Sequence, residues 1–381
     1  MLTFILDFGN RWTHCVTRIL LRIFGKLTEH HGKCGSEMRV LITGNLGYVG
    51  SVLVPFLAKT HTDWKLFGID TGYFGHCLLP KQPIPERYLE IQRINDIRNV
   101  TINELKEIDV VVHLASLSND PLGNRFDSLT QAINVDAGIK LAKFAKSTGV
   151  RRFILASSCS VYGRGFVRER KEDDELDPLT SYARSKVVLE GMLNEIADEN
   201  FSVIALRFAT ACGFSPRLRI DLVLNDFVIN AVLNKRIQVL SDGSPWRPLI
   251  HVNDMSRAID WAIEADLETP YLIMNVGSKE WTFRVSELAQ LVSQVVPGTK
   301  IEINSSAGQD PRSYRVDFSK FEKFAPLHQP IMKLHESVLQ LAASIRDVTL
   351  EGLDSISHLR RLDEVLRLSS SKSLDPELNW I

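Results

Sequence analysis

Short apolar runs alternate with amphipathic segments from Met38 to about residue 207. The runs are apolar at nearly every position rather than at every second one. They stand at Val40–Thr43, Leu66–Asp70, Val110–Leu114, Phe153–Ser157 and Val203–Arg207. Continuous apolar runs of this length are typical of strands in a parallel sheet that is covered on both faces.

Segments with helical periodicity lie between several of these predicted strands. They span Tyr48–Thr60, Ser128–Ser147 and Ser181–Glu199. In the second segment, Ile133, Ala137 and Leu141 share one face, as expected of a helix packed on a sheet. The alternation predicts an α/β fold built on a doubly wound parallel sheet.

The regular alternation weakens beyond residue 208, where turn-forming clusters appear. We expect a first domain over residues 38–206, with a returning segment at about 237–265. Residues 207–236 and 266–381 would form a smaller second lobe. Apolar spacing from about Ile331 and over Leu359–Leu368 predicts two late helices. Such helices more often pack on a core or cover a site than carry chemistry.

The first 37 residues differ from the rest of the chain. Between Val16 and Leu27, apolar residues follow one helical face, and Arg18, Arg22 and Lys26 form a second stripe. One interpretation is a membrane-surface or targeting segment. We favour a dispensable extension, because Met38 directly precedes the first predicted strand. No apolar run reaches the roughly 18 residues that a membrane span needs.

Composition narrows the function classes. The chain has 381 residues, with 45 Lys+Arg against 46 Asp+Glu and a net charge of −1. This balance argues against a generally basic nucleic-acid binder. The five cysteines are scattered without a Cys-x-x-Cys pair. We therefore expect neither a metal site nor a disulfide framework, and a reducing compartment such as the cytoplasm.

A glycine-rich turn separates the first predicted strand from the first helix. Gly44, Gly47 and Gly50 are spaced three residues apart. Gly44 permits a tight turn, Gly47 lets backbone N–H groups approach a pyrophosphate, and Gly50 lets the helix pack close to the sheet. The N-terminus of that helix would direct its free N–H groups at the phosphates. An ordinary glycine turn is the alternative.

The second predicted strand favours a nucleotide site, because it ends at Asp70. A carboxylate at this position accepts hydrogen bonds from a ribose 2′-hydroxyl and repels a 2′-phosphate. We therefore expect NAD rather than NADP. The alternative is that Asp70 is a turn or cap residue before Gly72.

Tyr182 and Lys186 stand at i and i+4 in a predicted helix and so project from one face. A phenol with a pKa of about 10 is a poor base, but a nearby ammonium group favours the tyrosinate. The tyrosinate can remove a hydroxyl proton as hydride leaves the same carbon. Ser158, at a strand end, can hydrogen-bond the reacting oxygen. The alternative is a surface helix with a snorkelling lysine.

In their order and spacing, these motifs resemble the extended short-chain dehydrogenase/reductases, specifically the nucleotide-sugar epimerases and dehydratases. The resemblance runs from about Met38 to Lys320 and implies a Rossmann fold with NAD. It also implies that Ser158 is catalytic, Tyr182 is the base and Lys186 is its activator. The residues implied at the cofactor are Gly44, Asn45, Leu46, Gly47, Tyr48, Val49, Gly50, Asp70, Asp96, Ile97, Leu114, Ala115, Asn134, Tyr182 and Lys186.

The resemblance also implies contacts with a nucleoside-diphosphate sugar, which would include Ser158. Arg247 and Arg312 are candidates for the diphosphate, since a planar guanidinium suits that group. A surface ion pair is the alternative for each. Thr210 stands where the family usually has an asparagine, and its hydroxyl can still form a hydrogen bond.

The two residues after Ser158 bear on the reaction. The family's 4,6-dehydratases carry an Asp-Glu pair there, whereas this chain has Cys159 and Ser160. The leading hypothesis is therefore an NAD-dependent C4 epimerase of a nucleotide-sugar. The alternatives are a nucleotide-sugar reductase or dehydrogenase, and a non-catalytic NAD-binding regulatory protein. The family also implies a homodimer formed through the helices at Ser128–Ser147 and Ser181–Glu199.

Overall fold

The computed structural model describes residues 37–118, 120–164, 168–304, 306, 312–350 and 357–381. Residues Arg39–Ile381 make up one unit. The amphipathic N-terminal segment discussed above lies outside the described residues. No described helix is both long and apolar enough to cross a lipid bilayer.

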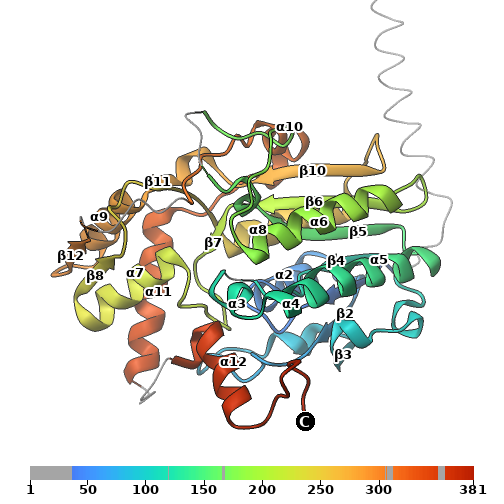
Figure 1. The fold of residues 1–381 in the computed structure, drawn as a ribbon, viewed down its shortest axis with the longest axis horizontal. Coiled ribbons are helices and arrows are strands. Elements are labelled where there is room, and N and C mark those ends of the chain that lie inside the picture. Colours follow the sequence, from blue (N-terminus) through green and yellow to red (C-terminus); the bar gives the residue numbers. More distant parts are fainter. Residues whose placement is uncertain (1–36, 119, 165–167, 305, 307–311, 351–356) are drawn as a thin grey trace, which may run out of the picture. The chain divides into compact units, whose positions relative to one another are not determined.

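Seven parallel strands form the main sheet within the described part of the chain, in the order β10-β6-β5-β4-β1-β2-β3 (Figure 1). The order reverses between β1 and β4, the place where doubly wound sheets bind ligands. The predicted fold class is confirmed. The strands are β1 (Arg39–Thr43), β2 (Lys65–Asp70), β3 (Ile91–Ile94), β4 (Val110–His113), β5 (Arg152–Ser158), β6 (Ser202–Phe208) and β10 (Tyr271–Val276).

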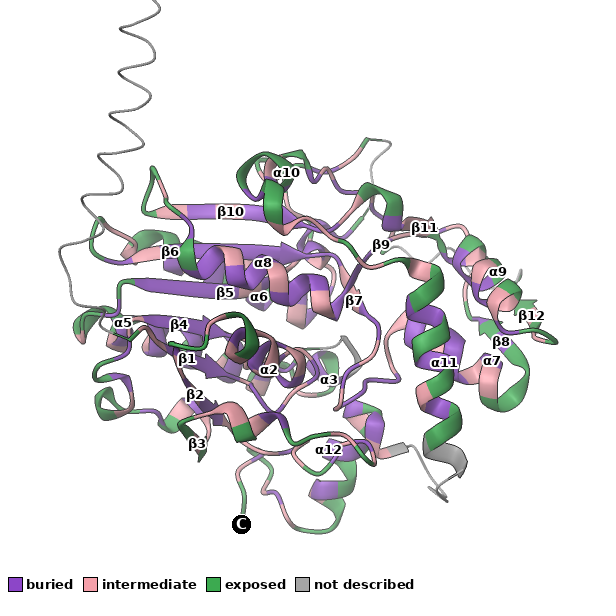
Figure 2. Cartoon of the chain, turned by 180° about the vertical axis from the view of Figure 1, so that it is seen from behind, coloured by how far each residue is buried: buried purple, intermediate pink, exposed green. Residues whose placement is uncertain are grey.

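Helices cover both faces of this sheet, and the central strands between them are buried (Figure 2). α2 and α8 pack together on one face, whereas α3 to α6 pack on the other. The sheet-covering helices are α2 (Gly50–Thr60), α3 (Asp120–Arg125), α4 (Asp127–Thr130), a π-helical segment (Gln131–Ala137), α5 (Gly138–Ser147), α6 (Ser181–Ile196), α8 (Val252–Glu264) and α10 (Ser319–Phe324).

A second lobe follows β6 and packs around a separate apolar cluster that includes Leu224, Leu288 and Leu341. Its strands form two small sheets, β11-β9-β7 and β12-β8. The elements of this lobe and of the C-terminal segment are β7 (Thr210–Cys212), α7 (Val223–Asn234), β8 (Arg236–Val239), β9 (Trp246–His251), β11 (Thr282–Arg284), α9 (Val285–Val295), β12 (Lys300–Ile303), α11 (Leu334–Leu350) and α12 (Arg361–Ser370).

The sequence predicted that residues 237–265 return to the first domain. Within the predicted returning segment 237–265, only α8 packs on the main sheet, while β8 and β9 belong to the small sheets. The strand that returns is β10, which pairs in parallel with β6. We missed β10 because a short apolar run cannot be distinguished from a buried helix segment by periodicity alone.

Candidate active site

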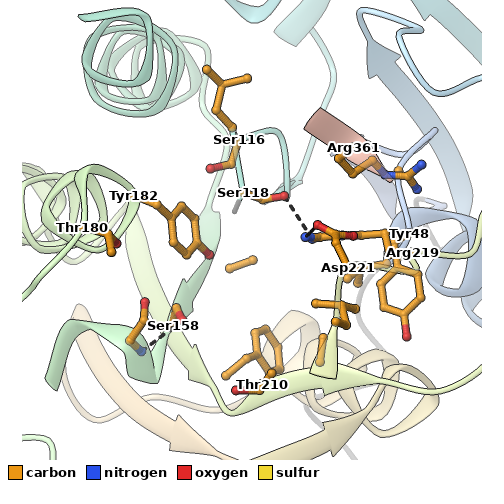
Figure 3. Close-up of a pocket in the computed structure, with 18 of the residues that line it drawn as sticks. Tyr48, Ser116, Ser118, Ser158, Thr180, Tyr182, Thr210, Arg219, Asp221 and Arg361 are labelled. Atoms are coloured by element: carbon orange, nitrogen blue, oxygen red, sulfur yellow. Dashed lines mark hydrogen bonds and ion pairs between the residues drawn. The ribbon is translucent and has the colours of Figure 1, made fainter. Parts of the chain in front are cut away.

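A cavity of about 1030 Å³ opens at the carboxyl ends of the main-sheet strands (Figure 3). It gathers most of the site residues predicted from distant parts of the sequence. Those that line it are Gly44, Gly47, Tyr48, Val49, Asp70, Asp96, Ile97, Leu114, Ala115, Ser158, Tyr182, Lys186, Thr210, Arg247 and Arg312. Asn45, Leu46, Gly50 and Asn134 are not part of its lining.

The glycine turn leaves no room for side chains. Gly44 has a φ of +75°, and a Cβ there would lie 2.6 Å from the backbone nitrogen of Ala115. A Cβ on Gly50 would lie 2.4 Å from the Cα of Asn45. The turn therefore places the N-terminus of α2 directly against the strands, where its N–H groups suit an anion. This cradle fits the diphosphate of a dinucleotide.

Asp70 ends β2 beside the glycine turn. Its Oδ2 accepts a hydrogen bond from the backbone N–H of Leu46 (2.9 Å), and its Oδ1 accepts one from Gly72 (2.8 Å). Burial raises the pKa of Asp70, and these hydrogen bonds oppose that rise. The bond from Gly72 fits the turn-residue interpretation, but Asp70 also lines the cavity. Asp70 therefore ties the glycine turn to the loop after β2 at the edge of the cavity.

Asp96 lines the cavity, whereas Asn134 does not. Asp96 forms an ion pair with Arg98 (2.8 Å) and caps the 3₁₀ turn Ile97–Asn99. Asn134 lies behind the lining, where its Oδ1 accepts from the backbone of Leu117 (2.8 Å) and its Nδ2 donates to Ser185 (3.0 Å). Asn134 thus fixes the loop after β4 rather than lining the cavity.

α6 presents Tyr182 and Lys186 to the cavity. Thr180 caps this helix, because its Oγ1 accepts from the backbone of Ala183 (3.2 Å). The Lys186 ammonium nitrogen lies 5.5 Å from the centre of the Tyr182 ring. Burial lowers the pKa of Lys186 to about 8. No described residue accepts a hydrogen bond from this ammonium group, so its donors are available to a ligand.

Ser158 ends β5 and reaches the same opening as Tyr182 (Figure 3). Its Oγ accepts from the backbone of Ser160 (3.1 Å). In the 3₁₀ turn that follows, the Cys159 thiol is buried and donates to the carbonyl of Arg207 (3.1 Å). The Ser160 hydroxyl is buried and has no partner among the described residues. This turn offers hydroxyl groups, and no carboxylate, next to Ser158.

The sequence did not predict the buried polar network that lies next to Ser158 and Lys186. Glu190, one turn after Lys186, accepts from Arg207 (2.7 Å) and from Ser157 (2.5 Å). Arg207 also donates to the Tyr162 hydroxyl (3.0 Å). The network ties α6 to the ends of β5 and β6. A charged residue inside an apolar strand was the available signal, since buried charges are normally paired.

The substrate-side candidates come from the second lobe. Thr210 lies in β7, Arg247 lies in β9, and Arg312 follows β12. All three line the cavity. The Arg247 guanidinium donates to the backbone carbonyl of Arg312. The two predicted arginine segments therefore meet at this part of the cavity.

Two other arginines line the cavity and were not predicted. Arg219 lies across from Tyr182, forms an ion pair with Asp221 (2.8 Å) and donates to Ser118 (3.3 Å) (Figure 3). Arg361 comes from α12 near the end of the chain. No local spacing marks either residue, because only the tertiary fold brings them to the glycine turn.

Comparisons with known proteins agree with this geometry. Residues 40–277 match the NAD dependent epimerase/dehydratase family. UDP-glucuronic acid decarboxylase 6 of Arabidopsis thaliana is 27% identical over 313 residues, covering 80% of this chain and 87% of that protein. The uncharacterized UDP-glucose epimerase YtcB of Bacillus subtilis is 27% identical over 300 residues, covering 74% and 90%.

Solved structures also resemble this chain. MoeE5 in complex with UDP-glucuronic acid and NAD has a TM-score of 0.68 at 25% identity. The match covers 81% of this chain and 99% of that one. The similarity therefore extends well beyond the residues that match the family.

Proposed function

This chain belongs to the NAD-dependent epimerase/dehydratase family and is an NAD-dependent enzyme, and we propose that it is a C4 epimerase of a nucleoside-diphosphate sugar. The observation that carries the proposal is that Tyr182, Lys186 and Ser158 line one cavity together with the glycine turn. These residues can move a hydroxyl proton next to a hydride acceptor.

NAD bound at the glycine turn would supply the hydride acceptor and donor. Gly44, Gly47 and the N-terminus of α2 would hold its diphosphate, and Asp70 would accept from its ribose. Lys186 would donate to cofactor hydroxyls from the ammonium group that no described residue engages. Asp96 and Ile97 would flank the adenine.

Tyr182 would remove the proton from the sugar 4-hydroxyl as the C4–H bond breaks, which leaves a 4-keto sugar. Lys186 stabilises the tyrosinate by its charge, and Ser158 donates a hydrogen bond to the sugar oxygen. After the sugar turns over, Tyr182 returns the proton as hydride returns to the opposite face of C4. The net reaction inverts the configuration at C4 without net oxidation of the sugar.

The relatives support a UDP-sugar as the substrate. Their names, and the ligands of MoeE5, include UDP-glucose and UDP-glucuronic acid. Arg247 and Arg312 would bind the diphosphate, and the Thr210 hydroxyl would contact the sugar. Two arginines on meeting segments suit a diphosphate because each offers paired N–H donors.

Decarboxylation is the second candidate, because the Arabidopsis relative is a UDP-glucuronic acid decarboxylase. Oxidation of a glucuronic acid at C4 yields a β-keto acid, which loses carbon dioxide without a base. The resulting enolate must then take a proton at C5. We rank epimerisation first because the turn Cys159–Tyr162 offers no carboxyl group to supply that proton.

The test incubates the purified full chain with UDP-glucose and with UDP-glucuronic acid. NMR follows the sugar, and absorbance follows reduced nicotinamide. We expect a C4-inverted sugar of unchanged mass and no net nicotinamide reduction. Release of carbon dioxide would instead establish the decarboxylase, and stoichiometric reduction of added NAD would establish a dehydrogenase.

A further inference from the structure

The C-terminal segment 357–381 lies beyond the residues 40–277 that match the family, yet it packs against the cavity. Its helix α12 brings Arg361 into the lining (Figure 3). Val365 and Leu368 of α12 share a buried apolar cluster with Tyr73 and Ile97. Tyr73 and Ile97 themselves line the cavity.

The Arg361 guanidinium is buried and forms no direct ion pair with a carboxylate among the described residues; Asp70 and Asp221 act on its charge only from a distance. Arg361 is 4% exposed, and one of its terminal nitrogens, Nη1, is buried without a hydrogen-bond partner among the described residues. The other donates to the backbone carbonyl of Arg217 (3.0 Å). By contrast, Arg217 is paired with Glu86 (2.6 Å), and Arg219 is paired with Asp221 (2.8 Å).

The neighbours of Arg361 place this charge beside α2. Arg217, whose carbonyl Arg361 contacts, donates to Ser51 in the first turn of α2 (3.0 Å). The Arg361 guanidinium also lies 4.4 Å from the centre of the Phe74 ring, and Phe74 lines the cavity with Asp70. Arg217 therefore links the Arg361 guanidinium to the first turn of α2, whose N-terminus carries a positive partial charge.

This arrangement favours an anion. Burial of a charge without a direct ion pair is unfavourable, and burial together with the charge of Arg219 lowers the pKa of Arg361 to about 10. A diphosphate at the glycine turn would compensate the charge. A guanidinium forms its strongest hydrogen bonds with such oxygens.

The last residues of the chain bond to the loop after β2, two residues of which line the cavity. The Trp380 indole N–H donates to the carbonyl of Thr71 (2.6 Å), and the Tyr73 hydroxyl donates to the carbonyl of Leu378. Thr71 and Tyr73 lie within three residues of Asp70 and line the cavity. The tail is thus bonded to the loop that carries the predicted ribose ligand.

The tail also contacts the segment expected to flank the adenine. Arg98, the ion-pair partner of Asp96, donates to the carbonyl of Glu377 (2.8 Å) and to the side chain of Asn379 (3.0 Å). The same arginine therefore fixes both Asp96 and the tail. Residues 377–380 therefore bond both to the loop after Asp70 and to the segment at Asp96. These are the two segments expected to contact the adenosine part of NAD.

We propose that the C-terminal segment 357–381 is part of the cofactor site. Arg361 binds the diphosphate of NAD, and residues 377–380 close the adenosine end, so the segment slows the release of NAD. This inference rests on the placement of NAD at the glycine turn and adds an element outside the matched residues. NAD and the ordering of this segment are then thermodynamically linked.

The experiment measures the dissociation constant and the release rate of NAD on the full chain and its variants. Arg361→Gln should weaken NAD binding by roughly tenfold or more, and Arg361→Lys, which keeps the charge, should weaken it less. Trp380→Ala, at an exposed position, should speed NAD release. Lys372→Gln removes an exposed charge from the same segment and should leave both values unchanged.

Limited proteolysis gives a readout independent of turnover. NAD should protect the segment 357–381 from cleavage in the wild-type chain, and this protection should be reduced in Arg361→Gln. Equal NAD binding by wild type and Arg361→Gln would overturn the inference. So would a variant that binds UDP-glucuronic acid less tightly but NAD equally well, since Arg361 would then serve the substrate.

A variant of the glycine turn tests the placement of NAD there separately from the role of the C-terminal segment. Gly44→Ala should lose NAD, because a Cβ at φ +75° is strained and would overlap Ala115. If Gly44→Ala loses NAD but Arg361→Gln does not, only the role of the C-terminal segment is wrong. If Gly44→Ala keeps NAD, the placement at the glycine turn is wrong.

Discussion

At the residue scale, two functional groups determine the proposed chemistry, the Tyr182 phenol and the Lys186 ammonium. Lys186 is 2% exposed, and the nitrogen lies 5.5 Å from the Tyr182 ring centre. The buried ammonium group of Lys186 lowers the stability of the folded protein, but its positive charge favours the tyrosinate form of Tyr182. The requirements of folding and of catalysis therefore conflict at Lys186.

Tyr182→Phe removes the base and keeps the ring. We expect kcat to fall by about 10²- to 10⁴-fold, while NAD stays bound because its proposed phosphate and ribose contacts are unchanged. Steady-state rates and the NAD content of the purified protein measure the two effects. Tyr88→Phe, at a half-buried tyrosine that does not line the cavity, is the control and should be neutral. A Tyr182→Phe variant with the wild-type rate would refute the assignment.

Lys186→Met removes the buried charge and so tests whether that charge lowers the stability of the folded protein. In the folded protein the pKa of Lys186 is about 8, below the ordinary value of 10.5. Below pH 8 both folded and unfolded chains carry the proton, so the burial penalty is fully present. Between pH 8 and 10.5 the unfolded chain binds more protons, and wild-type stability rises relative to the variant.

Lys186→Met should therefore raise the free energy of unfolding at pH 7 by roughly 3 kcal/mol. The gain should shrink as the pH approaches 10. Denaturant unfolding of the apo protein at several pH values measures it. A gain that does not change with pH would show that Lys186 is not a buried charge.

At the element scale, the glycine turn and α6 are the two pieces that local sequence predicts well. Gly44 and Gly50 approach the backbone too closely for a side chain, so their spacing carries information. β10 and the Glu190–Arg207 pair were not predicted. Strand β10 and this ion pair both depend on which strands become neighbours in the sheet. The local pattern of a single sequence does not predict strand neighbours.

Gly50→Ala and Gly191→Ala form a matched pair of substitutions. A Cβ at Gly50 would overlap the backbone of Asn45, whereas a Cβ at Gly191 meets nothing within 4 Å. We expect Gly50→Ala to lower the unfolding free energy by about 1–3 kcal/mol and to weaken NAD binding. Gly191→Ala should stabilise α6 by up to about 1 kcal/mol. Thermal melts with and without NAD measure both, and similar behaviour of the two variants would contradict the packing argument.

At the scale of the whole molecule, the site is assembled from both the main sheet and the second lobe. The sequence located Asp70, Ser158 and Tyr182 because they stand beside strands and helices with clear patterns. It did not locate Arg219 or Arg361. Arg219, which precedes α7, and Arg361 of α12 reach the cavity only through the tertiary fold, and such long-range contacts leave no periodic signal.

The predicted homodimer also belongs to this scale. Family resemblance places its interface on α4, α5 and α6, and Val188 of α6 is 44% exposed. We propose that light scattering of the full chain will give twice the mass of one chain, and that Val188→Glu will shift it toward the monomer. A monomeric wild type at micromolar concentration would contradict this proposal.

The central claim is reversible oxidation at C4 with inversion. The most direct measurement uses UDP-glucose and UDP-glucuronic acid that carry deuterium at C4, with NMR and mass analysis of the products. We predict products of inverted C4 configuration that retain the deuterium at C4 and the full mass of the substrate. Loss of deuterium to solvent, or its appearance at another carbon, would contradict the account.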